Sequence, residues 1–245
     1  LEKYKKKYKI IHYKKDINKK KDFLKFTNNK EISHLVHFAA LSREKCDLNK
    51  KLCINTNFKS VKLIIDIFNS LKHKPKFIFI SSSHVYGNSK TKLKESSKLN
   101  PKSLYAKLKI RSENYIMKNY SNYSILRIFN VYGKKQPPGY FIPDMINKIK
   151  NNSEITINQS VRDFIHVNEV SRIINFVIEK KVDGILNIGT GKGIKLDLLI
   201  KKISKKLKKK TFIRFAKKKD KIIADISLLK LKKYKFKYNE KYTNF

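Results

Sequence analysis

A tyrosine and a lysine four residues apart are the residues of this sequence best suited to proton transfer. Tyr105 and Lys109 lie in the segment PKSLYAKLK, where Pro101 precedes a predicted helix over residues 103–119. Residues four apart on a helix lie on one face, so their side chains can interact. A lysine ammonium stabilises a neighbouring phenolate and lowers the phenol pKa from about 10 towards neutrality. The spacing therefore predicts a tyrosine that acts as a general acid or base.

Three serines precede this pair at the end of a predicted buried strand. The segment KFIFISSSHVYG places Ser81, Ser82 and Ser83 at the carboxyl end of a strand over residues 76–81. Open α/β sheets build their sites at that edge. We therefore expect these hydroxyl groups to donate hydrogen bonds into a crevice.

The Tyr-x-x-x-Lys spacing is not specific by itself, because lysine is abundant. Tyr86 and Lys90 have the same spacing, but the Gly-Asn-Ser between them indicates a turn. Lys107, two positions along the predicted helix, points away from Tyr105. The pattern becomes specific through the order of serine-bearing strand end, proline and helical pair. The alternative, a core tyrosine beside a surface lysine, is less favoured.

The elements that would position these groups follow an α/β pattern, in which short apolar runs alternate with longer helical stretches. Buried strands are predicted over residues 8–13, 34–38, 76–81 and 123–128, and helices over 47–71 and 103–119. After Gly133 the segment KKQPPGY breaks this pattern. The later strands are predicted over residues 155–157, 163–167 and 185–188, and the later helices over 168–179 and up to about 209.

The glycines offer no phosphate-binding turn early in the chain. The sequence has seven glycines and the first is Gly87, so no glycine-rich turn can follow the first predicted strand. Gly189, Gly191 and Gly193 fail the dinucleotide pattern because Ile194 stands at its last glycine position. A tight strand-to-helix turn is the favoured interpretation of that cluster.

The charge of the chain is strongly positive. Its 245 residues include 59 Lys and Arg against 19 Asp and Glu, a net charge of +40. Such an excess is typical of proteins that bind nucleic acid or membrane surfaces. Here it is almost all lysine, spread from end to end, as a drift towards A/T-rich codons would produce. Drift is favoured and no nucleic-acid partner is expected; a basic nucleic-acid-binding protein is the non-enzyme alternative.

The cysteines and the apolar runs indicate an intracellular protein. Cys46 and Cys53 are seven residues apart in one predicted helix, about 10 Å along its axis. That distance is too long for a disulfide. No apolar run approaches the ~20 residues that span a bilayer, and no leader opens the chain. We expect a cytoplasmic location, no membrane partner and no metal site.

Eight segments, in order, resemble the NAD-dependent epimerases and dehydratases of nucleotide sugars, within the extended short-chain dehydrogenase family. They are Asp16–Ile17, His37–Leu41, Asn57, SSSHVYG, YAKLK, Arg127–Gly133, Arg162–Val167 and Asn187–Gly191. The resemblance implies an α/β fold: a Rossmann-like, doubly wound parallel sheet with a smaller C-terminal α/β substrate domain. It divides the chain into a partial NAD-binding domain over residues 1–133 and a nucleotide-sugar domain over 134–245, from which some segments return to the first.

The family's first βα unit has no counterpart here. Its glycine turn normally receives the cofactor pyrophosphate at a helix N-terminus. We therefore expect this chain as given to bind NAD weakly or not at all. The sequence is expected to be either a piece of a longer protein or a decayed homologue.

The resemblance also implies a role for each site residue. Tyr105 is the acid–base group, Lys109 holds the nicotinamide ribose and lowers the tyrosine pKa, and Ser82 is the catalytic hydroxyl. The implied cofactor contacts are Asp16, Ile17, Phe38, Ala39, Ala40, Asn57, Tyr105, Lys109 and Phe129. The implied substrate contacts are Ser83, Asn130, Tyr140, Phe141 and Arg162.

Among these residues, Arg162 resembles the family's pyrophosphate-binding arginine, whose forked donors suit phosphate oxygens. The alternative is a salt bridge to Asp163, although neighbouring residues on a strand point apart.

The implied activity is that of a UDP-glucose 4-epimerase-like enzyme, which transfers a hydride transiently to NAD, with NADP as the alternative cofactor. The dehydratases of the family carry acidic residues after the catalytic hydroxyl, where this chain has Ser83 and His84. An epimerase is therefore preferred over a 4,6-dehydratase or a keto-sugar reductase. A truncated, non-catalytic homologue is a further alternative. The resemblance also implies a homodimer.

Overall fold

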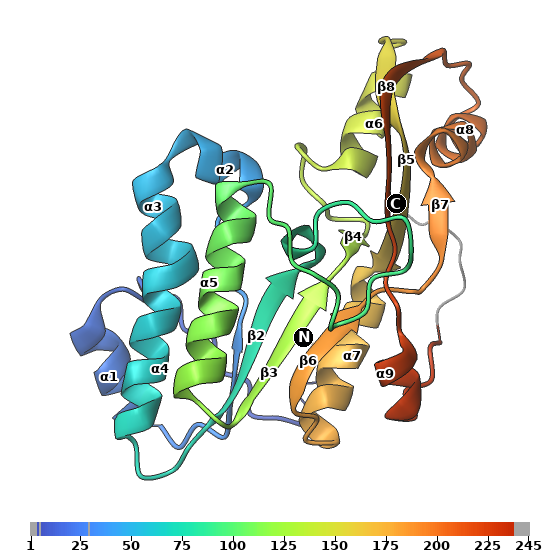
Figure 1. Ribbon diagram of the computed structural model, residues 1–245. Coiled ribbons are helices and arrows are strands. Elements are labelled where there is room, and N and C mark those ends of the chain that lie inside the picture. The colour runs from blue at the N-terminus through green and yellow to red at the C-terminus, as the bar shows by residue number, and fades with distance from the viewer. Residues whose placement is uncertain (1–3, 5, 29, 238–245) are drawn as a thin grey trace. The chain divides into compact units, whose positions relative to one another are not determined.

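The computed structural model describes residues 4, 6–28 and 30–237 (Figure 1). The contacts within the chain divide it into two compact units. The first comprises Leu1–Ser81, Pro101–Ile125 and Val177–Gly184. The second comprises Ser82–Asn100, Leu126–Phe176 and Ile185–Phe245. The sequence analysis divides the chain at residue 133 by the ligand that each part is expected to bind. That division stays a prediction.

A parallel α/β sheet supplies the strands of the first unit, although its residues Leu126–Ile128 and Ile185–Ile188 belong to the second unit. The strands β1 (His34–His37), β2 (Lys76–Ser82), β3 (Tyr123–Ile128) and β6 (Gly184–Ile188) follow the hydrogen-bonded order β1-β2-β3-β6. β1 and β2 are parallel, with His34 opposite Lys76 and His37 opposite Phe79. Phe77, Ile78 and Phe79 on β2 are all buried. Such a continuous apolar run is typical of a strand that is covered on both faces.

The helices of the first unit are α1 (Lys20–Asn28), α2 (Arg43–Leu48), α3 (Lys50–Ile54), a π-helical turn (Asn55–Lys59), α4 (Ser60–Ser70) and α5 (Leu104–Asn119). α4 and α5 lie side by side (Figure 1). The predicted strands over 34–38, 76–81 and 123–128 and the predicted helix over 103–119 are confirmed.

The predicted strand over residues 8–13 is wrong. All six residues are described, and none of them belongs to a strand. A strand needs a neighbour to satisfy its backbone N–H and C=O groups. In the described sheet β1 pairs with β2, and the segment 8–13 has no strand partner.

The helix predicted over residues 47–71 is confirmed from Lys50 to Ser70, where α3, the π-helical turn and α4 follow without a break, but Asn49 separates it from α2. Asn49 has φ −139° and ψ 88°, and its N–H donates to Lys45 O at the end of α2. Its side-chain Oδ1 accepts from Leu52 N at 2.9 Å and caps the start of α3. Asparagine often competes with helix in this way, through local side-chain hydrogen bonds.

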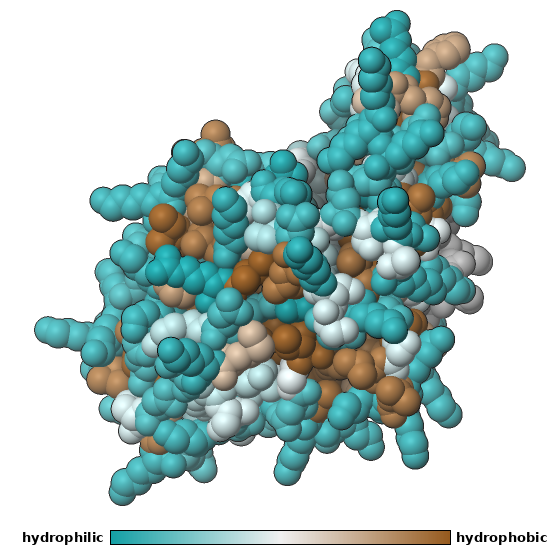
Figure 2. Space-filling model, in the orientation of Figure 1, coloured by the Kyte–Doolittle hydropathy of each residue, from teal (hydrophilic) through white to brown (hydrophobic). Residues whose placement is uncertain are grey.

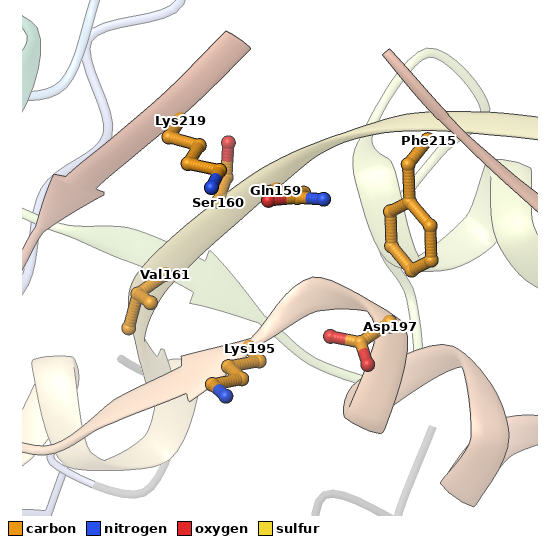
Figure 3. Close-up of a pocket in the computed structure, with 7 residues that line it drawn as sticks. All are labelled: Gln159, Ser160, Val161, Lys195, Asp197, Phe215 and Lys219. Carbon is orange, nitrogen blue, oxygen red and sulfur yellow. The ribbon is translucent and has the colours of Figure 1, made fainter. Parts of the chain in front are cut away.

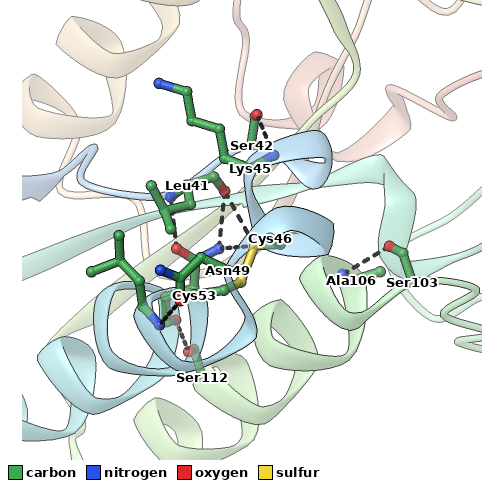
Figure 4. The surroundings of a disulfide bond; sticks show 11 residues. Leu41, Ser42, Lys45, Cys46, Asn49, Cys53, Ser103, Ala106 and Ser112 are labelled. Carbon is green, nitrogen blue, oxygen red and sulfur yellow. Dashed lines mark hydrogen bonds between the residues drawn. A yellow bond between two sulfur atoms is a disulfide. The ribbon is translucent and has the colours of Figure 1, made fainter.

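The interruption brings Cys46 and Cys53 together as a disulfide, which corrects the expectation that they lie too far apart (Figure 4). Their Cα atoms are 4.9 Å apart, within the range of disulfides. The predicted separation along one helix axis does not apply, because the chain changes direction between α2 and α3.

A mixed sheet organises the second unit. It contains β4 (Asn130–Tyr132), β5 (Ile155–His166), β7 (Gly193–Lys195) and β8 (Ile213–Ile222). β4 and β8 pair with β5 in parallel, and β7 pairs with it antiparallel. The strands predicted over 155–157 and 163–167 are therefore parts of one long strand, β5, which pairs with β8 over Ile155–Arg162 and with β4 over Phe164–His166.

Two helices cover this sheet, α6 (Phe141–Lys150) and α8 (Leu196–Leu207). Their apolar residues form one core with the strands, which includes Met145, Ile157, Phe164 and Leu199. The other described elements are a 3₁₀ turn (Ser83–Val85), α7 (Val167–Glu179) and α9 (Ser227–Leu231). The predicted strand over 185–188 and helix over 168–179 are confirmed.

Hydrophilic side chains cover most of the face shown in Figure 2, with smaller apolar patches between them. Exposed lysines occur on elements of both units, for example Lys51 on α3 and Lys205 on α8. The absence of a nucleic-acid partner stays a prediction. Among the described residues, no helix is long and apolar enough to cross a membrane.

Candidate active site

Tyr105 and Lys109 lie in the first two turns of α5. Ser103 caps the helix, since its hydroxyl oxygen accepts from Ala106 N at 3.3 Å. The helix begins at Leu104, so Tyr105 and Lys109 are one turn apart. The Lys109 ammonium lies 5.8 Å from the centre of the Tyr105 ring. The structure therefore brings these two predicted residues together.

Lys109 is almost fully buried, with 3% of its surface exposed. Its Nζ donates to Ile80 O of β2 at 2.7 Å and lies 4.7 Å from the centre of the Phe79 ring. Burial lowers the pKa of Lys109 to about 8, although the nearby Glu113 carboxylate opposes that shift. The site thus holds an ammonium group against the tyrosine in a place with little access to water.

The three predicted serines have different surroundings. The Ser81 hydroxyl donates to the carboxylate of Glu113, a fully buried residue of α5. Ser82 Oγ accepts from His84 N at 3.3 Å, and that bond does not use the Ser82 hydroxyl proton. Ser83 is buried in the 3₁₀ turn. Ser81 is therefore the serine that is hydrogen-bonded to α5. The hydroxyl proton of Ser82 is not used in its bond with His84 N.

The predicted catalytic residues divide between the two units. Tyr105 and Lys109 belong to the first, and Ser82 belongs to the second. Their predicted roles stay a proposal for this reason.

The predicted cofactor loop follows β1. Phe38, Ala39 and Ala40 are exposed there, in irregular backbone. The next residue, Leu41, is held by the buried Asn57: its N–H donates to Asn57 Oδ1 at 2.7 Å, and its carbonyl accepts from Nδ2 at 3.0 Å. Asn57 therefore fixes the end of this loop through hydrogen bonds.

Asp16 and Ile17 lie in the segment before α1. Asp16 is exposed, and its Oδ1 accepts from the backbone N–H of Asn18 at 2.9 Å. This local turn occupies part of the carboxylate that was predicted to approach the adenine. Ile17 is half-buried beside it.

Phe129 and Asn130 occupy the second unit. Phe129 is buried, and its N–H donates to Ile188 O at 2.9 Å. Asn130 begins β4, and its Nδ2 donates to Asp163 O at 3.0 Å. That bond leaves the Asn130 side-chain oxygen as an acceptor for other groups.

Arg162 pairs with a carboxylate that the sequence analysis missed. Its guanidinium lies 2.7 Å from Asp220 Oδ1 on β8. Burial alone would raise the pKa of Asp220, but hydrogen bonds from Arg162 and Ser160 lower it. The only sequence signal for Asp220 was a single acidic residue within a run of lysines, KKKD.

The alternative salt bridge from Arg162 to Asp163 does not form. Asp163 is buried, and its carboxylate instead accepts from the N–H groups of Thr190, Gly191 and Ala224. Burial raises the pKa of Asp163, and these hydrogen bonds oppose the shift. A Cβ at Gly189 would lie 2.7 Å from Asp163 Oδ2, so this turn requires glycine.

Tyr140 and Phe141 begin α6, in the second unit. The Tyr140 side chain is exposed. Phe141 packs on the core, with its ring centre 6.2 Å from that of Phe164. Tyr140 is therefore open to a ligand, whereas the ring of Phe141 supports the sheet.

A buried tyrosine, Tyr86, belongs to a hydrogen-bond network that the sequence did not indicate. Tyr86 OH donates to Asn187 Oδ1 at 2.7 Å and accepts from Arg127 at 2.9 Å. Asn187 N donates to the Glu95 carboxylate at 2.7 Å. Burial raises the pKa of Tyr86 to about 12, against the opposing effect of Arg127. Tyr86 therefore links Asn187 and Arg127 in the interior of the second unit.

A pocket of about 380 Å³ lies on the sheet of the second unit (Figure 3). It is lined by Gln159, Ser160, Val161, Lys195, Asp197, Phe215 and Lys219. None of these is a predicted site residue. Among the described residues, no group of three His, Cys, Asp or Glu side chains is placed to hold a metal ion.

The strand register places most of this pocket on the other face of the sheet from Arg162, although Ser160, which also lines it, bonds Asp220, the ion partner of Arg162. Gln159 is opposite Lys219, and Val161 is opposite Lys195. Paired residues share a face of the sheet, and successive residues alternate between faces. The side chains of these four residues therefore lie on one face and that of Arg162 on the other.

The comparisons with known proteins point to one family. Residues 2–189 match the family model described as "NAD dependent epimerase/dehydratase family". The chain is 29% identical over 182 residues to ADP-L-glycero-D-manno-heptose-6-epimerase of Brachyspira hyodysenteriae. The matched region covers 68% of this chain and 56% of that protein. It is 25% identical over 181 residues to dTDP-D-glucose 4,6-dehydratase of Dictyostelium discoideum. This match covers 65% of the chain and 42% of that dehydratase. The chain thus spans about half the length of these curated relatives.

The fold is that of solved nucleotide-sugar epimerases. UDP-N-acetylglucosamine 4-epimerase from Methanobrevibacter ruminantium M1, in complex with UDP-N-acetylmuramic acid, is 28% identical with a TM-score of 0.77, and the match covers 91% of this chain and 76% of that one. UDP-glucuronic acid 4-epimerase from Bacillus cereus, in complex with UDP-glucuronic acid and NAD, has a TM-score of 0.81 at 24% identity, over 92% and 76%. The predicted Rossmann-like α/β fold is confirmed.

Proposed function

Because the chain belongs to the NAD dependent epimerase/dehydratase family, we propose that it serves the epimerisation of a nucleotide sugar, with Tyr105 as the acid–base group. The observation that carries the proposal is the buried ammonium of Lys109, which lies 5.8 Å from the centre of the Tyr105 ring. A positive charge in a site with little water favours the phenolate, so the tyrosine can accept a proton from a sugar hydroxyl.

The residues present fit one end of NAD. The Lys109 ammonium has three N–H donors, and Ile80 O takes one of them, so others are available to ribose hydroxyls. Phe38, Ala39 and Ala40 form an exposed loop with two small side chains, which lets a flat group approach the backbone. For the pyrophosphate this sequence has no glycine turn, since its first glycine is Gly87. When bound, NAD would supply the hydride acceptor and donor for the sugar carbon.

Each residue of the chain has a defined task in this proposal. Tyr105 takes the proton from the sugar hydroxyl and later gives it back. Lys109 stabilises the phenolate in between and holds the ribose. Ser82 donates its hydroxyl proton to the sugar oxygen. Arg162 and Asn130 bind the nucleotide diphosphate, and the exposed Tyr140 contacts the base or the sugar.

The epimerase is preferred to a 4,6-dehydratase as the activity. Two supports are the UDP-sugar epimerases among the solved structures and the Ser83 and His84 that follow the catalytic hydroxyl. A dehydratase needs a further acid to remove water from the sugar. Dehydration is the second candidate activity, because the chain is also similar to the dehydratase of Dictyostelium. A homodimer is proposed from the family alone.

The proposal is tested by binding and by turnover. Isothermal titration with UDP-glucose measures substrate binding without NAD, and conversion of UDP-glucose to UDP-galactose with added NAD measures epimerisation. Arg162→Lys removes the forked donor and is expected to weaken UDP-glucose binding about tenfold. Arg172→Lys, on α7, is the matched control and leaves binding unchanged. Equal affinities of the two variants would contradict the assigned role of Arg162, and release of a 4-keto-6-deoxy sugar would favour the dehydratase.

A further inference from the structure

The disulfide of the first unit belongs to the apolar cluster on which the proposed acid–base tyrosine packs. Cys46 and Cys53 are both fully buried and form an apolar cluster with Phe58 and Leu108. Tyr105 is one of the half-buried residues that pack on this cluster. The bridge and the tyrosine ring therefore share one apolar cluster.

The same disulfide borders the residue that holds the cofactor loop. Asn57 Nδ2 donates to Leu41 O at 3.0 Å and lies 3.5 Å from Cys46 Sγ. Cys46 Sγ itself lies 3.8 Å from Leu41 O. In Figure 4, Leu41 is beside the bridge that joins Cys46 and Cys53. The end of the loop over residues 38–41 is thus packed on one of the two sulfur atoms.

A further bond connects this region to α5. The Ser112 hydroxyl donates to Asn57 O at 2.8 Å. Ser112 is fully buried on the helix that carries Tyr105 and Lys109. Asn57 therefore links the bridge, the loop after β1 and the helix of the proposed acid–base pair.

We propose that Cys46 and Cys53 are positioning residues, and that their disulfide holds Tyr105 and the loop over residues 38–41 in the arrangement needed for turnover. The proposal rests on the proposed function of Tyr105. A dithiol reductant reverses this state: it breaks the S–S bond, gives two electrons and two protons to form two thiols, and becomes a disulfide itself.

The physical reason lies in the close packing around the bridge. Two thiols that are no longer bonded must move apart to van der Waals distance. Both cysteines are fully buried, so this movement displaces neighbouring atoms in a cluster without free space. Leu41 and Asn57 border Cys46, and Tyr105 packs on the same cluster. A shift of about 1 Å at a reacting group can cost 100-fold in rate, so a partial shift is expected to lower kcat roughly tenfold.

Kinetics of the full chain with NAD provide the first test. The protein is oxidised or reduced with dithiothreitol, and a thiol titration confirms each state. We expect kcat for UDP-glucose to be about tenfold lower after reduction, with an altered pH profile of kcat and with KM changed less. The variant Cys46→Ala/Cys53→Ala is the matched control, because its kcat does not respond to dithiothreitol. Equal kcat values and pH profiles in the two states of the natural chain would overturn the proposal.

Hydrogen exchange provides a test that needs no turnover. The amide of Leu41 is bonded to Asn57 Oδ1, and its exchange reports directly on that contact. We expect it to exchange at least several-fold faster in the reduced chain than in the oxidised chain, and the double variant to show no difference. If neither redox state epimerises a sugar, the proposed function fails while this comparison still decides whether the bridge holds the loop. Equal exchange rates, or two free thiols after oxidation, would overturn the proposal.

Discussion

Two segments of this chain share the spacing Tyr-x-x-x-Lys and differ in everything else. Tyr105 lies on a helix with the ammonium of Lys109 5.8 Å from its ring centre. Tyr86 lies at a turn that Gly87 makes with φ +70°, and the cation at its ring is Arg127, 4.9 Å away. The Tyr86 hydroxyl both donates to Asn187 and accepts from Arg127.

The contrast shows what makes a tyrosine suitable for proton transfer. Tyr86 is buried, and its raised pKa of about 12 keeps its proton in place. Tyr105 is half-buried, and the neighbouring cation, Lys109, is the group whose pKa burial has lowered. Spacing selects both segments, but the local backbone and the hydrogen-bond partners distinguish Tyr86 from Tyr105, the proposed acid–base residue.

The largest expected effect comes from Tyr105→Phe. This change removes the proposed proton acceptor, and general acid–base groups typically contribute 10²- to 10⁴-fold to a rate. We expect kcat for UDP-glucose epimerisation to fall by about that factor, with the affinity for UDP-glucose unchanged in isothermal titration. A fall in kcat of less than about tenfold would contradict the assignment of Tyr105, rather than Tyr86, as the acid–base group.

Lys109→Met is expected to remove a pH dependence of stability. Burial lowers the folded-state pKa of Lys109 to about 8, below the 10.5 of a free lysine. The unfolded chain therefore binds more protons between these values, so the free energy of unfolding rises with pH from about 8 to 10.5, by on the order of 3 kcal/mol.

Urea unfolding at pH 7 and pH 10 measures this term. The rise between the two pH values should be smaller in Lys109→Met than in the natural chain. Lys107→Met, an exposed position on the same helix, is the control and keeps the natural rise. The same rise in both variants would show that the ammonium of Lys109 is not desolvated.

Tyr86→Phe is expected to affect stability rather than rate. The change leaves Asn187 Oδ1 and the Arg127 guanidinium without the hydroxyl that bonds both. A buried group deprived of its partner costs about 1–3 kcal/mol. Urea unfolding should show that loss, while kcat per folded molecule stays at the natural value. A loss of turnover comparable with that of Tyr105→Phe would reverse the roles given to the two residues.

The smallest effect is expected from Lys90→Met. Lys90 is exposed in the turn after Tyr86, and surface changes away from special features usually stay within about 0.5 kcal/mol. Neither the unfolding free energy nor kcat should change measurably. A clear change in either quantity would mean that the Tyr86–Lys90 spacing has a role that its turn conformation and exposed lysine do not indicate.

Local signals account for the part of the site that the sequence predicts. Pro101, the Ser103 cap and the apolar spacing all act within a few residues, and they give the helix that brings Tyr105 and Lys109 together. The buried apolar run before Ser82 likewise gives a central strand. Helix and strand type depend on such short-range patterns, so they can be read from one sequence.

Contacts between distant segments account for what the sequence does not predict. Arg162 and Asp220 meet because β8 pairs with β5, and no pattern within either segment indicates that pairing. The segment over residues 8–13 has strand-like residues but no partner strand in the described sheet. The disulfide was missed because a single residue, Asn49, ends one helix and starts the next.

This double role of Asn49 gives the chain a route for losing its disulfide without any change to a cysteine. Alanine at this position would favour one uninterrupted helix from α2 into α3, in which the two sulfur atoms would lie about 10 Å apart along the axis. Formation of the disulfide is thus expected to depend on the exposed amide side chain of Asn49. Sequence drift at that surface position would therefore change the chemistry of the protein interior.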